Sequence, residues 1–233
     1  MAQQISSGKQ KPKATTIEDW ARSDVYHNSF LIPQDSVLDA ALKNSAANDL
    51  PEIAVSVSQG KFLQLHARAI QAKRILEVGT LGGYSTIWLG RALPKDGELI
   101  TLEISSKHAK VAEENLSNAG LSSKCKIIVG PGHESMVELP SEKKFDFIFI
   151  DADKPSNVKY FTEAKRLIRK GGVIIVDNVV RFGRVADPEQ SDPNIEGVRS
   201  LLNALKGDKD VDATTIATVG EKAYDGFIYA IRN

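Results

Sequence analysis

Nearly continuous apolar runs alternate with helical patterns through the middle of the chain. Such runs are typical of strands in a parallel sheet that helices cover on both faces, and the segments between them repeat apolar residues at helical spacing. The predicted strands are 74–78, 98–104, 124–129, 145–151 and 172–177. The predicted helices that follow them are 84–92, 107–119, 133–139, 159–169 and 193–206.

Different patterns occupy the two ends of this alternation. Two helical segments, 33–51 and 58–72, precede the first strand. Two apolar runs, 213–219 and 227–232, flank a short glycine-containing loop, so one of these strands should run antiparallel. We therefore predict the α/β class, a doubly wound and mostly parallel seven-stranded sheet with an N-terminal helical extension.

The chain length and the polar N-terminus suggest one domain behind a tail. Residues 1–16 carry lysines and almost no large apolar side chain, so they cannot bury enough surface to offset the entropy of ordering. We predict a disordered tail there and a single domain over residues 17–233. The whole chain of 233 residues, 42% of them hydrophobic, is sufficient for one core of good size.

Charge and cysteine content narrow the classes of function. Thirty basic and thirty acidic residues give a formal net charge of zero, which disfavours nucleic acid or an anionic membrane as a partner. No run of transmembrane length and no secretory signal pattern is present. The lone Cys125 excludes an intrachain disulfide and fits a reducing compartment. We expect a cytoplasmic protein that acts on neither membranes nor nucleic acid.

Acidic side chains stand at the ends of four predicted strands. In doubly wound sheets, ligands bind beyond these carboxyl ends. Each residue alone could cap the next helix, but a group of them needs a bound cation or ligand hydroxyls to offset its repulsion. If the fourth strand stays extended, Ala152 should face away from its two acidic neighbours. The residues are Glu77, Glu103, Asp151, Asp153 and Asp177, the last followed by Asn178.

The turn "EVGTLGGYS", residues 77–85, opens a helix and permits close backbone approach. Leu81 stands where a dinucleotide fingerprint needs glycine, and no P-loop lysine follows. Glu77 would crowd a pyrophosphate but suits a cationic ligand. Glu103, 26 residues later, lies where such folds place the carboxylate that accepts ribose hydroxyls. A positively charged nucleoside without phosphate describes S-adenosylmethionine.

Four motifs resemble the metal-dependent class I O-methyltransferases of the caffeoyl-CoA and catechol type. They are "ILEVGTLGGYSTIWLG", "LITLEIS", "FDFIFIDADK" and "GGVIIVDNVVRFGRVADP". The segment "IAVSVSQGKFL" is similar to the piece that closes over the cofactor in that family. The resemblance implies a Rossmann-like methyltransferase fold, S-adenosylmethionine as cofactor, and Mg²⁺, with Mn²⁺ or Ca²⁺ as substitutes. It also implies a small phenolic substrate with vicinal hydroxyls, catechol or caffeoyl in type, and a homodimer.

The resemblance also assigns roles to single residues. It places the general base at Lys154 and a second catalytic residue at Asp151. It implies the metal ligands Asp151, Asp177 and Asn178, whose oxygen donors suit a hard cation. The implied cofactor contacts are Val55 (backbone), Glu77, Gly79, Thr80, Ser85, Glu103, Gly132 and Asp153.

Three positions depart from the family pattern. Ser156 and Asn157 stand where the family often has an Asn-Tyr pair. The family usually has an aromatic residue within about two positions after the motif "VDN". Here the residues at 179–182 are Val-Val-Arg-Phe, so the first aromatic residue comes later. Glu103 replaces the more common aspartate, which preserves the ribose acceptor. The first two positions line the acceptor side, so they bear on substrate identity.

Other functions remain compatible with the same strand ends. One alternative is a nicotinamide-dependent reductase, against which Leu81 and the lack of a Tyr-x-x-x-Lys pair argue. A catalytically inactive binding protein is another, although the expected metal oxygens and the lysine are all present. A third is methylation of nucleic acid or protein, of which the nucleic-acid substrate is disfavoured because the chain has no net positive charge.

Overall fold

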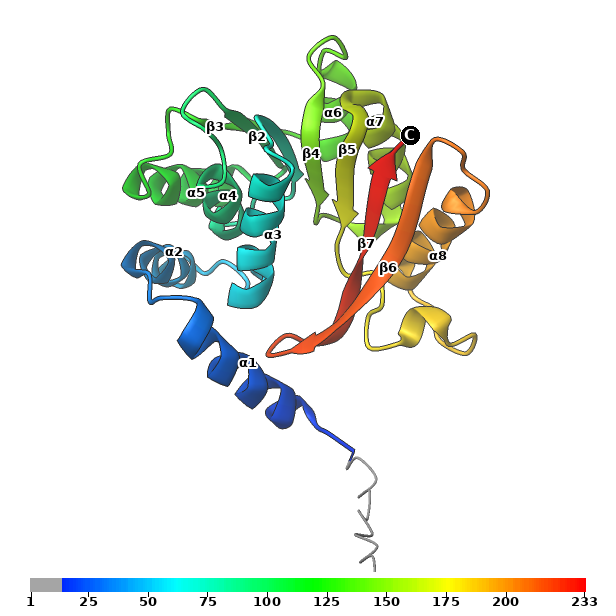
Figure 1. The fold of residues 1–233 in the computed structure, drawn as a ribbon, viewed down its shortest axis with the longest axis horizontal. Coiled ribbons are helices and arrows are strands. Elements are labelled where there is room, and N and C mark those ends of the chain that lie inside the picture. The colour runs from blue at the N-terminus through cyan, green and yellow to red at the C-terminus, as the bar shows by residue number, and fades with distance from the viewer. Residues whose placement is uncertain (1–13) are drawn as a thin grey trace, which may run out of the picture.

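The computed structural model describes residues 14–233, so most of the predicted tail lies outside the described residues. Seven strands form one mixed sheet in the order β3-β2-β1-β4-β5-β7-β6 (Figure 1). The first five strands are parallel, and β7 runs antiparallel to both of its neighbours, which confirms the predicted class. The strands are β1 (Arg74–Val78), β2 (Glu98–Glu103), β3 (Cys125–Val129), β4 (Phe145–Ile150), β5 (Ile168–Val176), β6 (Val211–Gly220) and β7 (Ala223–Arg232).

Eight α-helices and two short 3₁₀ helices among residues 14–233 connect and cover these strands. None of them is long and apolar enough to cross a membrane. The α-helices are α1 (Ile17–Leu31), α2 (Ser36–Ala47), α3 (Val57–Ala69), α4 (Tyr84–Gly90), α5 (Ser106–Asn118), α6 (Gly132–Glu138), α7 (Asn157–Leu167) and α8 (Pro193–Leu205), and the 3₁₀ helices are η1 (Lys154–Ser156) and η2 (Arg184–Ala186).

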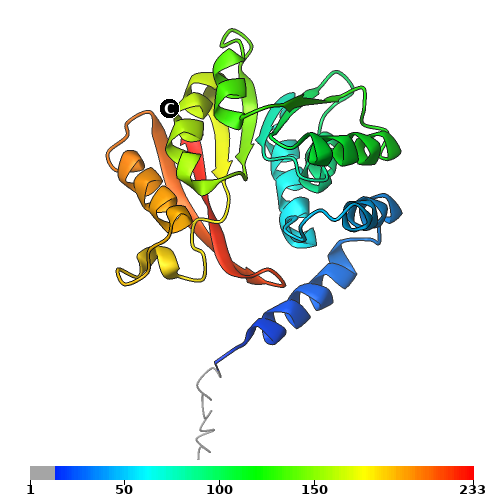
Figure 2. The same ribbon diagram turned by 180° about the vertical axis from the view of Figure 1, so that it is seen from behind.

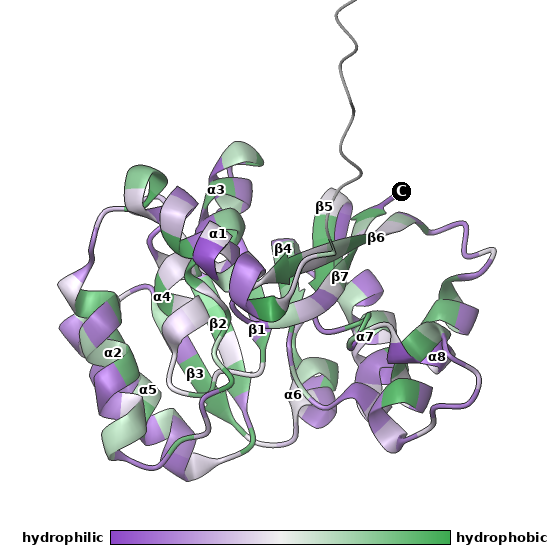
Figure 3. Ribbon diagram, turned by 90° about the horizontal axis from the view of Figure 1, so that it is seen from below, coloured by the Kyte–Doolittle hydropathy of each residue, from purple (hydrophilic) through white to green (hydrophobic). Residues whose placement is uncertain are grey.

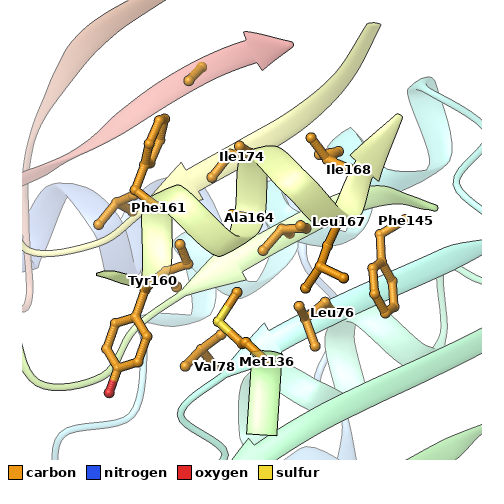
Figure 4. Packing of buried hydrophobic residues seen from close by; sticks show 14 of the residues in the cluster. Leu76, Val78, Met136, Phe145, Tyr160, Phe161, Ala164, Leu167, Ile168 and Ile174 are labelled. Atoms are coloured by element: carbon orange, nitrogen blue, oxygen red, sulfur yellow. The ribbon is translucent and has the colours of Figure 1, made fainter. Parts of the chain in front are cut away.

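Alternation along the strands divides the core into two layers. One set of strand side chains, including Leu76 and Ile174, packs against α6, α7 and α8. Figure 4 shows this layer, with Phe161 and Leu167 of α7 lying over the strands. The other set packs against α2 to α5. Colouring by hydropathy shows strands that are largely hydrophobic between helices of mixed character (Figure 3), as expected for a sheet buried on both faces.

The helix α1 was not among the predicted segments. It contains no buried residue, and Val25, Tyr26 and Phe30 are exposed, so its sequence has no stripe that would mark a core-facing helix. Figures 1 and 2 both show it standing beside the tip of the β6–β7 hairpin. There the Asp24 carboxylate accepts a hydrogen bond from the Glu221 backbone N–H at 3.0 Å.

Strand β5 begins four residues earlier than the prediction of 172–177, at Ile168. Residues 168 and 169 were predicted as the end of the preceding helix, 159–169, which the glycines at 171 and 172 were expected to close. Pairing with β4 is irregular there, with a register shift between Phe145 and Phe147. The extension lies at the amino end of the strand, away from the carboxyl ends that concern the site.

Strand order reverses between β1 and β4, and this switch point is where doubly wound sheets bind ligands. The two strands end in close contact, because Gly79 has φ +99° and a Cβ placed on it would collide with the Asp151 carbonyl oxygen. Glycine is therefore required where the chain leaves β1. The two loops that follow these strands form the centre of the site.

Candidate functional site

A cavity of about 630 Å³ opens at the switch point. Loops after β1, β2, β4 and β5 line it together with segment 51–55, which precedes α3. It brings together ten of the residues expected from the sequence. These are Val55, Gly79, Thr80, Ser85, Glu103, Gly132, Asp151, Asp153, Lys154 and Asn178.

A second cavity, of about 330 Å³, adjoins the first. The first turns of α3 and the β6–β7 hairpin line it, with Phe62 and Phe227 as its aromatic residues. Asp177 lines this cavity, and Asn178 lines both. The three residues expected to bind metal therefore stand where the two cavities meet.

Glu77 lies behind the cavity wall and does not line the cavity. Its carboxylate is fully buried and accepts hydrogen bonds from Ser85 Oγ at 2.6 Å, from Thr101 Oγ1 at 2.7 Å and from the Thr86 hydroxyl. Burial raises the pKa of Glu77 to about 7, although the three hydroxyl donors oppose the shift. Glu77 therefore positions the Ser85 side of the glycine turn.

The Glu77 carboxyl should make stability depend on pH. A carboxyl whose pKa is raised on folding holds its proton more tightly in the folded state. Its contribution to stability is therefore greatest at low pH and falls as pH rises from 4.5 to about 7. A shift of this size corresponds to roughly 3 kcal/mol of unfolding free energy.

We expect Glu77→Gln to change this dependence. The melting temperature of the variant relative to wild type should be several degrees higher at pH 8 than at pH 5, because an amide has no proton to lose. Thermal unfolding of both proteins across this range is the measurement. Glu138→Gln, an exposed position on α6, is the control and should show no such difference. Parallel curves for Glu77→Gln and wild type would contradict the expectation.

Glu103 binds the backbone of the glycine turn. Its Oε2 accepts from the Thr80 N–H at 3.2 Å and the Leu81 N–H at 2.8 Å, and its Oε1 accepts from the Ser105 N–H at 2.9 Å. The side chain lines the cavity and is nearly buried. A carboxylate has about four lone-pair positions, so Glu103 can fix the turn and still accept from a ligand hydroxyl.

Asp151 and Lys154 form an ion pair on the cavity wall. Lys154 Nζ lies 3.1 Å from Asp151 Oδ1, and the lysine side chain is 6% exposed. Asp151 caps no helix, because the N-cap residue of η1 is Asp153. The alternative that Asp151 serves as a helix cap is therefore excluded. Although β4 ends at Ile150, Ala152 packs against the core layer of Ile148 and Ile150, in agreement with the expectation that it faces away from its acidic neighbours. The turn 151–154 as a whole lines the cavity.

Asp177 is the most deeply buried of the expected metal ligands. It accepts hydrogen bonds from Gln59 Nε2 at 2.6 Å and from the Asn178 backbone N–H at 2.8 Å. Burial, followed by the charge of Asp151, raises the pKa of Asp177. Asn178 itself has φ +54°, a strained backbone conformation that is concentrated at functional sites.

The donor set fits a hard divalent cation. Among residues 14–233 no three His, Cys, Asp or Glu side chains gather in a metal-binding arrangement, and the expected set contains two carboxylates and one amide. Its oxygens suit Mg²⁺ and are unsuited to soft metals. Asp151 also acts electrostatically on buried Asp177, and a dication between them would remove that repulsion.

Several residues of the site could not be found by inspecting strand ends. Tyr160 of α7 lines the cavity and donates a hydrogen bond to Asp153. Gln59 comes from α3, and its partner Asp177 is 118 positions away. Arg181, which the sequence marked only as a departure from the family pattern, lines the first cavity. A pair as far apart as Gln59 and Asp177 leaves no local signal in one sequence.

Comparisons with known proteins agree with this geometry. The pattern of the O-methyltransferase family matches residues 29–230. A catechol O-methyltransferase of Niastella koreensis is 48% identical over 210 residues, 89% of this chain and 95% of that protein. One of Mycobacterium tuberculosis is 47% identical over 208 residues, 89% of this chain and 94% of that protein.

A solved structure gives the same answer for the fold. The O-methyltransferase from Bacillus cereus, described in complex with SAH, is 46% identical and has a TM-score of 0.91. The match covers 94% of this chain and 100% of that one. The family resemblance of the sequence motifs is thereby confirmed. The chain belongs to the O-methyltransferase family.

Proposed function

We propose that this O-methyltransferase transfers a methyl group from S-adenosylmethionine to one hydroxyl of a vicinal dihydroxy phenol, with the help of a divalent cation. The observation that carries the proposal is the grouping of Asp151, Lys154, Asp177 and Asn178 where two cavities meet. The names of the relatives, catechol O-methyltransferases, and the SAH complex of the Bacillus cereus enzyme support it. Membership of the family favours methyl transfer over the hydride transfer considered from the sequence.

The larger cavity suits the cofactor. Its wall carries the glycine turn, the Glu103 carboxylate and the Asp153 carboxylate. We assign the ribose hydroxyls to Glu103, the Ser85 hydroxyl to the amino-acid end, and Val55 to the closing segment above. The bound cofactor supplies an electrophilic methyl carbon and departs as a neutral thioether, so the protein needs no general acid.

The smaller cavity suits the aromatic acceptor. Phe62 and Phe227 lie 5.3 Å apart by ring centroid and give it an apolar side. Asp177 and Asn178 stand at its inner end. A planar phenol with two adjacent oxygens at one edge would place those oxygens toward the carboxylates and its ring toward the aromatic side chains.

Lys154 is the proposed general base. A cation held by Asp151, Asp177 and Asn178 would orient the acceptor and favour its ionised form. Asp151, as a ligand of that cation, would be less available to Lys154, and the positive charge nearby would disfavour the charged ammonium. Lys154 then receives the proton of the acceptor hydroxyl at Nζ and, being nearly buried, excludes water from the reacting edge.

Glu103→Ala is expected to weaken S-adenosylmethionine binding. Loss of charge-assisted hydrogen bonds at roughly 1.5–3 kcal/mol each should raise the dissociation constant about tenfold or more. Calorimetric titration measures this directly. Glu98→Ala, on the same strand but at its exposed amino end, is the matched control. An unchanged dissociation constant in Glu103→Ala would remove Glu103 from the cofactor site.

The direct test is turnover with a defined acceptor. Purified protein is incubated with S-adenosylmethionine, catechol and Mg²⁺, with and without EDTA, and the product is identified by mass spectrometry. We expect a singly methylated catechol that disappears with EDTA. Cofactor binding without any methylated product from vicinal dihydroxy phenols would instead favour the inactive binding protein.

We also propose that the protein forms a homodimer. Helix α1 exposes Val25, Tyr26, Phe30 and Leu31, more large apolar surface than a free helix needs. Sedimentation equilibrium at micromolar concentration decides the question, and a stable monomer would refute the proposal.

A further inference from the structure

Arg181 lines the site and forms no ion pair with any carboxylate of residues 14–233. Its side chain is half-buried and lines the larger cavity together with Asn178 and Lys154. Its Nε is buried without a hydrogen-bond partner among residues 14–233. No carboxylate of the described chain forms an ion pair with its guanidinium, within the 4.0 Å that defines one.

The other arginines show how unusual this is. Within the described part of the chain, eight arginines form ion pairs or charge-assisted hydrogen bonds with carboxylates, and the remaining one, Arg68, is exposed to solvent. Those eight are Arg22, Arg74, Arg91, Arg166, Arg169, Arg184, Arg199 and Arg232. Burying part of a guanidinium without a partner is costly, so its position beside a cavity indicates an anionic ligand group.

The backbone around Arg181 is held in place. Asp225 of β7 accepts hydrogen bonds from the Val180 N–H at 3.0 Å and the Arg181 N–H at 2.8 Å through one oxygen. Arg181 and Phe182 both have positive φ, at 52° and 61°. Such strain persists only where the surrounding structure fixes it. The backbone position of Arg181 on the loop after β5 is therefore well defined.

Arg181 lines the larger cavity from the loop after β5, which also carries Asn178. The residues expected to bind the cofactor follow β1, β2, β3 and β4, whereas Arg181 follows β5 and lies three residues after Asn178. The smaller cavity, formed by α3 and the β6–β7 hairpin, adjoins the same loop. Arg181 therefore shares its loop with Asn178, which borders the proposed acceptor site, whereas we assign the amino-acid end of the cofactor to Ser85 on α4.

We infer that Arg181 binds a carboxylate on the methyl acceptor, so that the substrate class is a vicinal dihydroxy phenol bearing an acid group. This inference rests on the proposed function. Arg181 pairs with the carboxylate through the planar fork that suits such groups. With the carboxylate held by Arg181, the two adjacent hydroxyls would be left to face the cation proposed at Asp151, Asp177 and Asn178.

The test compares three acceptors that differ in one substituent. These are 3,4-dihydroxybenzoate, 3,4-dihydroxybenzamide and 3,4-dihydroxybenzylamine, each assayed for kcat/KM with saturating S-adenosylmethionine and Mg²⁺. Wild type should prefer the acid over the amide by about tenfold or more, the range expected of a charged hydrogen bond. Arg181→Gln should lose that preference, and Arg181→Lys should retain part of it.

Arg184→Gln is the matched control, because Arg184 lies on the same loop but pairs with Asp192 and does not line the cavity. It should keep the wild-type preference for the acid. Arg181→Gln should also bind S-adenosylmethionine as wild type does, by calorimetry. Weakened cofactor binding with an unchanged acceptor preference would assign Arg181 to the cofactor and overturn the inference.

Two further outcomes separate this inference from the proposed function. Wild type that methylates the amide or the amine better than the acid overturns the inference while leaving O-methylation intact, and this holds even if Arg181→Gln fails to fold. Wild type that binds S-adenosylmethionine and methylates none of the three acceptors removes the proposed function, and the inference with it.

Discussion

Asp151→Ala is expected to lose methyl transfer by about a hundredfold or more while keeping its fold. Even indirect partners of metal ligands are worth roughly 10–100-fold, and a ligand oxygen should lie at or beyond that limit. EDTA-treated wild type should fall to the same low level, and added Mg²⁺ should restore wild type but not the variant. The measurement is turnover against Mg²⁺ concentration for both proteins.

The structure changes what Asp151→Ala should do to stability. Relief of carboxylate crowding alone would stabilise the variant. Lys154, however, is nearly buried and pairs with Asp151 at 3.1 Å, and loss of one partner destabilises a buried pair. In the variant, Asp177 remains as a counter-charge for Lys154, since the two side chains already interact: the charge of Lys154 lowers the pKa of Asp177 in part. The two effects oppose each other, so we expect little change in melting temperature.

Asp146→Ala is the matched control for this prediction. Asp146 lies on β4, the strand that precedes Asp151, and its carboxylate pairs with Arg169 and accepts from the backbone N–H groups of Lys73 and Arg74. This position is at the opposite end of β4 from the site. The control should lose stability and keep its turnover, the reverse of Asp151→Ala. Equal turnover in Asp151→Ala and wild type would show that Asp151 holds no metal.

The architecture was predictable because its elements carry strong local patterns. Runs such as Phe145–Ile150 are buried except at Asp146 and are bounded by polar turns. Helix α7 has apolar residues on one face and charged residues on the other. Helix α1 was not predictable, because it buries no residue and its apolar side chains form no stripe that faces the core. Its contacts with the β6–β7 hairpin join segments almost 200 positions apart, which a local pattern does not encode.

Strand ends alone predicted the acidic part of the site, and the family resemblance added further residues that line the cavity, such as Val55 and Gly132. Acidic residues at strand ends meet because parallel strands bring their carboxyl ends to one edge. Glu77 was expected at the ligand, but its carboxylate is turned toward three hydroxyls and lies behind the wall. Side-chain direction at a strand end depends on which hydrogen-bond donors lie nearby. Those donors, Ser85, Thr86 and Thr101, come from two other elements.

Lys154→Met is expected to lower kcat by roughly 10²–10⁴-fold, the usual contribution of a general base. Affinity for S-adenosylmethionine should be retained, because Lys154 pairs with Asp151 and not with the residues assigned to the cofactor. The loss should be most severe below the pH at which the acceptor ionises in solution. Above that pH the acceptor arrives already deprotonated, so the difference between variant and wild type should narrow.

The pH profile distinguishes a base from a purely structural lysine. Lys165→Met is the matched control, since Lys165 on α7 also pairs with a carboxylate, that of Asp208, at 2.5 Å. That variant should show lower stability and a kcat ratio to wild type that is constant with pH. For Lys154→Met we expect the ratio to rise with pH, measured as kcat from pH 6 to 10 with one phenolic acceptor. A constant ratio for Lys154→Met would mean that Lys154 positions Asp151 and takes no proton, and the base would then have to be solvent.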